Sequence, residues 1–453
     1  MAKKFSKYLV LLFLLDALIG VAHGVTITAA SCAQSAVQSA VNSAANGDTV
    51  SIPAGSCSWT SSVSWTNKSI VVQGAGKDVT TIGCTNCFSI QSTSSTSAYS
   101  KWRLTGMTLQ GASPSGTTIT IWDNNDSAHY GWRIDHIKLN YPGAGGGYGI
   151  FVGGATYGLI DHNDWIWGNG MAIIIVAMMN GEASGSATVP QGGYVLSQPL
   201  DLGSLNAVYA EDNTFTSTVA GGCAAYDTSS GGGRMVFRYN VLAGCMYYDH
   251  WTRNGEIGGV LHEIYNNKFV GTAALNLYPI RLESGTGVIF NNTVTGYINN
   301  YAVFDERRGF YESSGALGAC DGTKSWDGNA GDPAAPGWPC LGQIGRAPGK
   351  SLAQIKAGDK QASAPIYLWN NGAQDGCRTG GACTNSMTVS VWDGSSKAVS
   401  YVKATPHPNG EVDYVLNGST PKPGYTPLIY PHPLQTGTVV TPVLQSPSNL
   451  IIQ

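Results

Sequence analysis

The stretch Gly287–Gly296 reads GVIFNNTVTG: a short apolar run, two asparagines, a Thr-Val-Thr segment and a glycine. The same pattern occurs upstream as HEIYNNKFVG (262–271), MVFRYNVLAG (235–244) and AVYAEDNTFTS (207–217). Aligned on the asparagine, and together with LIDHNDW (159–165), the copies give the positions Asn163, Asn213, Asn240, Asn267 and Asn292. The spacings are 50, 27, 27 and 25 residues. We interpret the spacing of 50 as two steps of about 25 residues.

A regular repeat of this length is typical of a solenoid. Two earlier segments extend the series, because RIDHIKL has Ile137 at the asparagine position and RLTGMTL has Met107 there. Pieces such as VIF, TVT and VYA favour short β-strands, no repeat carries a helical period, and the regular leucines of a leucine-rich repeat are absent. The pattern therefore predicts an all-β chain wound as a parallel β-helix, whose turns stack about 4.8 Å apart.

Stacked turns would bring the repeated asparagines into a ladder. Each side-chain amide can donate a hydrogen bond to the asparagine of one neighbouring turn while accepting one from the other. Asparagine also tolerates the left-handed backbone of a tight turn. We therefore interpret these asparagines as structural.

The segment before the first repeat predicts a cap for the open end of such a coil. Residues 32–55 read CAQSAVQSAVNSAANGDTVSIPAG, and one helical face carries Ala33, Ala36, Val37, Ala40, Val41 and Ala44. Asn46-Gly47 can end this helix, and TVSIPAG would begin the first strand. A helix at this place would cover strand edges that otherwise invite aggregation.

A short helix of the form AVQSAVNSA, followed by NGDTVSIPAG and irregular turns, resembles secreted right-handed parallel β-helix proteins of the pectate-lyase-like superfamily. The resemblance covers residues 30–310 and implies the fold, but the fold hosts lyases, hydrolases, esterases, epimerases and adhesins. The Asn-Thr-Asp, Gly-His-Gly and Arg-Ile-Lys motifs of polygalacturonases are absent. No clear counterpart of the calcium-binding aspartates and downstream arginine of pectate lyases is present either, so catalytic residues are not carried over.

The chain divides into four parts by composition. Residues 1–24, with lysines before LVLLFLLDALIGVAHG, predict a signal peptide and therefore a secreted or periplasmic protein. Residues 25–310 form the predicted β-helix, 311–435 a loop-rich extension that packs on or caps it, and 436–453 a tail. The apolar run MAIIIVAMM (171–179) is too short to span a membrane and fits a buried strand. We expect a monomer without a membrane span.

Cysteine and charge content narrow the function classes. The ten cysteines of an exported chain predict disulfides, which we place between sequence neighbours: Cys32–Cys57, Cys84–Cys87, Cys223–Cys245, Cys320–Cys340 and Cys377–Cys383. A metal or redox role for Cys84-x-x-Cys87 is the alternative, without a second motif or a nearby histidine to support it. Only 12% of residues are charged and the net charge is −3, so a nucleic-acid partner has no electrostatic support.

Charged residues nevertheless gather in four turns: CAAYDTSS (223–230), CMYYDHWTR (245–253), LYPIRLES (277–284) and YAVFDERR (301–308). Stacking of these turns predicts one charged groove. Our catalytic candidates are Asp227, Asp249, His250, Arg281 and Asp305. Our substrate-binding candidates are Tyr248, Trp251, Arg253, Tyr278, Glu283, Glu306, Arg307 and Arg308.

These residue types suit chemistry on a polysaccharide, including one that contains uronic acids. Asp227 and Asp249, aligned on neighbouring turns, would repel each other and so separate their pKa values, as an acid and a base require. Arg281 could neutralise an acidic sugar, and His250 could move a proton near neutral pH. The groove thus predicts a polysaccharide lyase or a glycoside hydrolase, with calcium as the cofactor that a lyase could use. The alternative is a non-catalytic, adhesin-like glycan-binding protein whose charges form a salt-bridge ladder.

A second candidate is the Asp-His pair, which occurs as Asp135-His136 and Asp161-His162 on consecutive turns. The segment GLIDHNDW resembles the Trp-Ile-Asp-His motif of pectate lyases. Both pairs lie beside the asparagine position, so we interpret them as structural. A metal site formed by the two pairs is the alternative.

Overall fold

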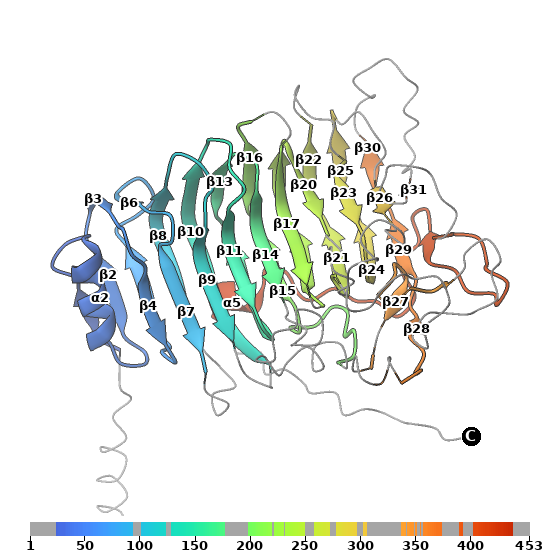
Figure 1. Cartoon of the computed structure of the whole chain (residues 1–453), viewed down its shortest axis with the longest axis horizontal. Coiled ribbons are helices and arrows are strands. Elements are labelled where there is room, and N and C mark those ends of the chain that lie inside the picture. The colour runs from blue at the N-terminus through green and yellow to red at the C-terminus, as the bar shows by residue number, and fades with distance from the viewer. Residues whose placement is uncertain are drawn as a thin grey trace, which may run out of the picture.

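The computed structural model describes residues 24–93, 101–123, 128–176, 198–219, 222–230, 232–249, 258–271, 278–296, 302–305, 337–340, 342–347, 349–350, 354, 357–373, 389–392 and 402–437. Short strands stack in parallel from one turn to the next and form an elongated coil (Figure 1). The predicted all-β parallel β-helix is confirmed. Residues 1–23 of the predicted signal peptide and residues 438–453 of the predicted tail lie outside the described residues.

Each turn of the coil contributes strands to two parallel sheets. Sheet B contains β4 (Val63–Thr66), β7 (Phe88–Ser92), β9 (Thr117–Asp123), β11 (Tyr148–Gly153), β14 (Met171–Val176), β17 (Cys223–Ser230), β20 (Cys245–Tyr248), β23 (Ile280–Leu282), β26 (Ala302–Asp305) and β31 (Val389–Trp392). Strand β14 is buried at Ala172, Ile173, Ile174 and Ile175, which confirms the buried strand that we predicted for this apolar run.

Sheet A is bent along its length into two columns of strands. One column contains β1 (Thr26–Thr28), β2 (Thr49–Ile52), β5 (Val71–Gly74), β8 (Arg103–Gln110), β10 (His129–Tyr141), β12 (Thr156–Asp161), β15 (Val208–Glu211), β18 (Arg234–Arg238), β21 (Leu261–Tyr265), β24 (Thr286–Phe290), β29 (Ile366–Trp369) and β32 (Tyr414–Leu416). The other contains β3 (Gly55–Ser58), β6 (Thr80–Gly83), the second halves of β8 and β10, β13 (Asp164–Trp167), β16 (Thr214–Ser217), β19 (Val241–Ala243), β22 (Lys268–Val270), β25 (Thr293–Thr295) and β30 (Gly372–Ala373). A two-stranded antiparallel sheet pairs β27 (Arg346–Ala347) with β28 (Ala362–Ser363).

Alternation along the strands decides which side chains fill the coil. Residues at matching positions of consecutive strands point inward and form apolar ladders, for example Leu104, Ile134, Ile160, Ala210, Phe237, Ile264, Ile289 and Leu368. Aromatic rings stack in the same way, as Trp102 and Trp132 do at 5.6 Å between ring centroids. Because successive side chains of a strand point to opposite faces, the residues between these ladders face outward and remain for function.

The asparagine ladder runs through six turns of the coil. Each side-chain Nδ2 donates to the Oδ1 of the next asparagine, from Asn163 through Asn213, Asn240, Asn267 and Asn292 to Asn371, at 2.9–3.1 Å. The left-handed conformation belongs to the preceding residue, for example Asn266 with φ of 56° and Asn291 with φ of 53°. The predicted ladder is therefore present, and the left-handed turn lies one residue earlier than the ladder asparagine.

The spacing of 50 residues between Asn163 and Asn213 is one turn, not two. Asn163 donates directly to Asn213, and β12 pairs directly with β15. The extra residues lie between β14 and β15, and residues 177–197 of this interval lie outside the described part of the chain. The ladder also continues past residue 310, because Asn371 follows β29, which pairs with β24.

Helix α2 (Gln34–Ser43) covers the N-terminal end of the coil (Figure 1). Its residues Val37, Ala40 and Val41 are buried, as is Ala44 just after it, whereas Ala33 is exposed at the N-cap. The Gln38 side chain accepts from the backbone N of Ser64 and donates to its carbonyl, both at 2.8 Å. The helix thus satisfies backbone groups of β4 that no further strand covers.

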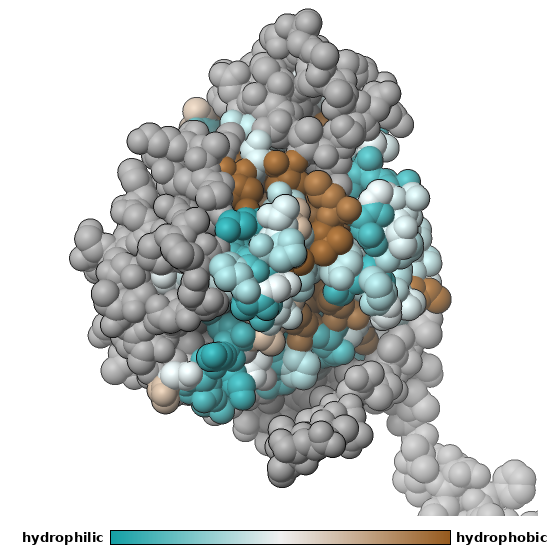
Figure 2. All heavy atoms as spheres, turned by 90° about the vertical axis from the view of Figure 1, so that its right-hand side faces the viewer, coloured by the Kyte–Doolittle hydropathy of each residue, from teal (hydrophilic) through white to brown (hydrophobic). Residues whose placement is uncertain are grey.

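The C-terminal third supplies strands and a long covering segment. Strands β29, β30 and β32 extend sheet A, and β31 extends sheet B. From β32 the chain turns back along the outside of the coil to the short helix α5 (Pro433–Thr436), which lies near its middle (Figure 1). We call Tyr425–Gly437 the C-terminal strap. Seen from the C-terminal end, an apolar area lies among hydrophilic ones (Figure 2), and β32 at this end exposes 47% of Leu416.

Three predicted disulfides are present in the described residues: Cys32–Cys57, Cys84–Cys87 and Cys223–Cys245. Cys340 is also disulfide-bonded, while Cys320, Cys377 and Cys383 lie outside the described residues. These bonds are consistent with an oxidising compartment. Within the described part of the chain, no helix is long and apolar enough to cross a membrane.

Candidate functional site

The predicted charged cluster falls on the outward face of sheet B. One outward row crosses five strands of this sheet. It contains Ile174 of β14, Asp227 of β17, Tyr248 of β20, Arg281 of β23 and Val303 of β26. Asp305 is paired with Trp392 at the end of the sheet, and Tyr278 is half-buried just before β23. The candidates His250, Trp251, Arg253, Glu306, Arg307 and Arg308 lie outside the described residues.

A β-bulge changes the expected alignment of Asp227 with Asp249. Cys223 pairs with Cys245, as the sequence suggests, but the register then shifts so that Tyr226 pairs with Tyr247. Asp227 is therefore level with Tyr248, one residue before Asp249. The cause is one extra residue in β17, because a bulge places two residues of one strand opposite one residue of its neighbour.

Asp249 is surrounded by donors from the coil itself. Its carboxylate is fully buried and accepts from the backbone N of Gly259 at 3.0 Å, from the backbone N of Ser284 at 2.9 Å and from the Ser284 hydroxyl at 2.8 Å. The Nε2 of His262 lies 3.6 Å away, and burial lowers the pKa of this histidine. These contacts give Asp249 a structural role, because they fasten three consecutive segments of the coil to one another.

Tyr248, Arg281 and Glu283 form a compact group on the same face. The guanidinium carbon of Arg281 lies 4.8 Å from the centroid of the Tyr248 ring. The Tyr248 hydroxyl donates to Glu283 Oε1 at 2.7 Å, and Arg281 approaches the same oxygen at 3.3 Å. Glu283 is completely buried, whereas 21% of the Arg281 side chain is exposed. The buried carboxylate thus orients a phenol and a guanidinium whose outer parts reach the surface.

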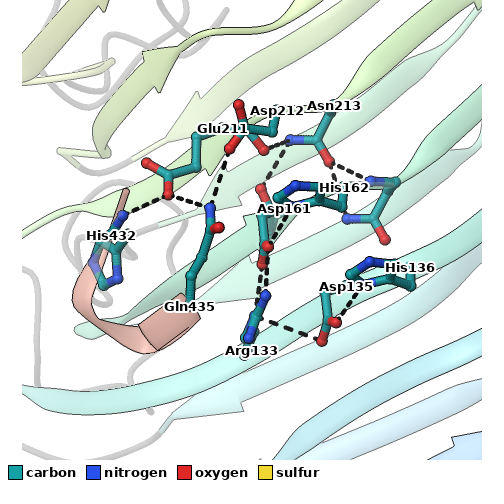
Figure 3. Close-up of polar contacts among 12 residues, drawn as sticks. Arg133, Asp135, His136, Asp161, His162, Glu211, Asp212, Asn213, His432 and Gln435 are labelled. Atoms are coloured by element: carbon teal, nitrogen blue, oxygen red, sulfur yellow. Dashed lines mark hydrogen bonds and ion pairs between the residues drawn. The ribbon is translucent and has the colours of Figure 1, made fainter. Parts of the chain in front are cut away.

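The first column of sheet A carries a second polar row, which is shown in Figure 3. Arg103 donates to Asp135, and Arg133 makes two bonds to Asp161 at 2.8 and 2.7 Å. Each carboxylate also contacts Nδ1 of the following histidine, His136 or His162, at 2.6 and 2.8 Å. Burial alone would raise the pKa of Asp135, but hydrogen bonds and charge from the two arginines and His136 hold it below its usual value.

The two histidines are turn residues with stacked rings. His136 and His162 have φ of 52° and 54°, and their parallel rings lie 5.2 Å apart. Their carboxylate partners are already bound by arginines. Across the described residues, no three His, Cys, Asp or Glu side chains are placed to hold a metal ion together. The geometry therefore agrees with our structural interpretation of the Asp-His pairs.

Further along the same row, Glu211 and Arg238 form an ion pair of 2.6 Å with both side chains fully buried. The C-terminal strap covers them, because Arg238 donates to the carbonyls of Leu428 and Ile429. Glu211 accepts from the backbone N of His432, as Figure 3 shows. Burial raises the pKa of Glu211, and the positive charge of Arg238 partly offsets this increase. Sequence patterns alone did not indicate this network. A signal was present in RMVFR, because Arg234 and Arg238 are four residues apart and therefore point to the same face of the strand.

No protein-family model and no curated protein matches the chain. Among solved structures, an alginate lyase from Paenibacillus sp. str. FPU-7 is similar at 12% identity and a TM-score of 0.38, over 62% of this chain and 89% of that chain. The ORF18 protein of Geobacillus virus E2 gives 13% identity and a TM-score of 0.31, over 85% of this chain and 63% of that chain. The catalytic domain of a GH87 α-1,3-glucanase is similar at 11% identity and a TM-score of 0.30, over 81% of this chain and 67% of that chain.

Proposed function

We propose that the protein is an exported enzyme that cleaves an acidic polysaccharide by β-elimination on the outward face of sheet B. The observation that carries the proposal is the stacked pair of Tyr248 and Arg281, oriented by the buried Glu283. Membership of the pectate-lyase-like superfamily, secretion, a monomeric state and the use of calcium remain predictions.

The chemistry of the group suits a uronic-acid unit. A guanidinium binds a carboxylate through two parallel hydrogen bonds, so Arg281 would hold the substrate carboxylate and stabilise the charge that develops when the C5 proton leaves. The Tyr248 oxygen lies beside Arg281 and would exchange a proton with the sugar. The C5–H and C4–O bonds break and a C4=C5 double bond forms, while the C5 proton passes to the Tyr248 oxygen and the proton of the Tyr248 hydroxyl passes to the leaving O4.

Burial favours elimination over hydrolysis. A glycoside hydrolase of the usual kind needs two carboxyl groups that flank the scissile bond. The described carboxylates of this region, Asp227, Asp249 and Glu283, are completely buried, and Asp249 is bound by coil donors. We therefore assign Asp249 and Glu283 to positioning. Roles for Asp227, Asp305 and the predicted residues outside the described part stay predictions.

The test is a panel of acidic and neutral polysaccharides offered to the purified full chain. Elimination produces short-wavelength ultraviolet absorbance from the new double bond together with new reducing ends. Reducing ends without that absorbance would support hydrolysis instead. Saturable binding without either product would favour the alternative of a non-catalytic glycan-binding protein, in which Tyr248, Arg281 and Glu283 only join adjacent turns.

A further inference from the structure

The polar strip under the C-terminal strap is assembled by the coil alone. Arg238 is held by Glu211 at 2.6 Å, and its guanidinium lies 5.0 Å from the ring centroid of Tyr209 and 5.9 Å from that of Tyr265. Arg133, on a more N-terminal turn, is fixed by its two bonds to Asp161. The strap takes part in none of these contacts. The strip would therefore keep its arrangement if the strap moved away.

Polar groups of the coil bind the strap through both its backbone and its side chains. Arg238 donates to two of its carbonyls at 2.7 and 3.1 Å, and Arg133 donates to the Leu434 carbonyl at 3.2 Å. Glu211 accepts from the backbone N of His432 at 2.8 Å and from the Gln435 amide at 2.6 Å. The contacts run from Trp369 on β29 to Arg133 on β10, a length of about 30 Å at the usual strand spacing. Four of these contacts recognise main-chain groups of the strap, and side chains of Tyr425, Tyr430 and Gln435 add bonds to acidic residues of the coil.

Two features are compatible with opening of the strap. The preceding linker, 417–424, is mostly exposed, and Gly418 and Gly424 have positive φ, so it can act as a hinge. Closure also buries groups that prefer water when charged: burial raises the pKa of Glu263, and it lowers the pKa of His432 to about 3. The strap therefore disfavours the charged forms of groups that it covers.

We propose that the C-terminal strap is a removable cover, and that the strip beneath it is a second binding site for an oligosaccharide. Arg133 and Arg238 offer donors, Glu211 and Asp212 offer acceptors, and Tyr209 offers a ring face. Sugar hydroxyls both donate and accept, so a glycan can replace the carbonyl and amide groups of the strap. Only the choice of an oligosaccharide rests on the proposed function; the cover itself does not depend on it.

Hydrogen exchange on the full chain tests whether the cover opens. The backbone amide of His432 donates to Glu211 of the coil in the closed state. It should exchange at least about tenfold faster than amides of the asparagine ladder, because opening the strap exposes it without unfolding the coil. Tyr430→Ala and Gln435→Ala each remove a bond to Asp212 and should accelerate this exchange further. Val241→Ala, at a partly exposed position of β19, is the matched control and should leave it unchanged.

Calorimetry with uronic-acid and neutral oligosaccharides then tests the site. We expect binding to tighten about tenfold in Tyr430→Ala, because a cover that opens more often competes less with the ligand. The same binding should persist in Arg281→Ala, which alters only the sheet B site, so failure of one proposal does not imply failure of the other. Strap amides that exchange only with global unfolding would overturn the cover. Equal or absent oligosaccharide binding in the wild type and the loosened variants would overturn the site.

Discussion

Glu211 and Arg238 lie on adjacent turns and form an ion pair of 2.6 Å that no solvent reaches. Such a pair is costly to bury and is offset only when further hydrogen bonds satisfy both partners. Here the remaining donors of Arg238 bind Tyr265 at 2.9 Å and strap carbonyls, and Glu211 is bound by His432 and Gln435. The pair therefore joins two turns of the coil to a segment that follows them by about 190 residues.

Removal of one partner should be far worse than removal of both. Arg238→Met leaves the Glu211 carboxylate buried without its cation and should lower the free energy of unfolding by about 3–5 kcal/mol. The double variant Glu211→Leu/Arg238→Met should recover most of that loss. Urea unfolding monitored by tryptophan fluorescence measures both. A double variant as unstable as Arg238→Met would show that the pair contributes through more than its charge.

The neighbouring asparagines Asn266 and Asn267, between β21 and β22, provide a matched pair. Asn267 accepts from the backbone N and side-chain amide of Asn240, so Asn267→Ala orphans buried groups and should cost about 2–4 kcal/mol. Asn266 only adopts the left-handed turn, so Asn266→Ala should cost about 1–2 kcal/mol. Thermal and urea denaturation provide the comparison. Equal losses would mean that the turn conformation, and not the ladder, determines stability.

His432 should make the protein sensitive to acid. Burial, with charge from Arg238 and Arg133, lowers its pKa from 6.5 to about 3. The unfolded chain then binds the proton more readily than the folded one. The contribution of neutral His432 to the free energy of unfolding is therefore fully present above about pH 6.5 and is lost as the pH falls toward 3. The loss approaches about 1.4 kcal/mol for each pH unit in that window.

His432→Asn keeps a side-chain acceptor for the Leu434 amide but does not titrate. The difference in unfolding free energy between the wild type and this variant should therefore change between pH 6.5 and about pH 4, with the wild type losing more. Glu211 and Glu263 titrate in both proteins, so the comparison isolates the histidine. Parallel stability curves across this range would contradict the buried neutral state of His432.

Activity variants probe the Tyr248–Arg281 pair. Tyr248→Phe should lower kcat by about 10²–10⁴-fold, because it removes the proton-exchanging oxygen and keeps the ring against Arg281. Arg281→Lys should not restore the loss seen in Arg281→Ala, because an ammonium lacks both the planar fork and the stacking surface. Lys77→Ala, outside sheet B, is a charge-matched control. Full turnover by Tyr248→Phe on every cleaved polymer would remove Tyr248 from the reaction.

Much of the coil could be predicted from sequence because its rules are local. Inward positions alternate with outward ones, and the asparagine returns once in each turn, so strands such as MVFR and GVIF reveal both the fold and the ladder. The Cys223–Cys245 disulfide, which we predicted by pairing sequence neighbours, is present. Long intervals between strands disturb the count, because they lengthen the spacing between two ladder asparagines that are direct neighbours. The prediction of two turns between Asn163 and Asn213 is wrong for this reason, and the ladder position of Asn371 is hidden by it.

The sequence by itself determined the stacked turns, the inward ladders and the concentration of charge near residues 223–308, since each follows from spacing along the chain. Tertiary structure alone decided which charged side chains are exposed and which neighbours they have. One extra residue at the bulge in β17 changes the neighbour of Asp227, and the fold of later segments buries Asp249 and covers Glu211 and Arg238. The physical reason is that exposure and hydrogen-bond partners depend on segments far apart in sequence, whereas periodicity records only near neighbours.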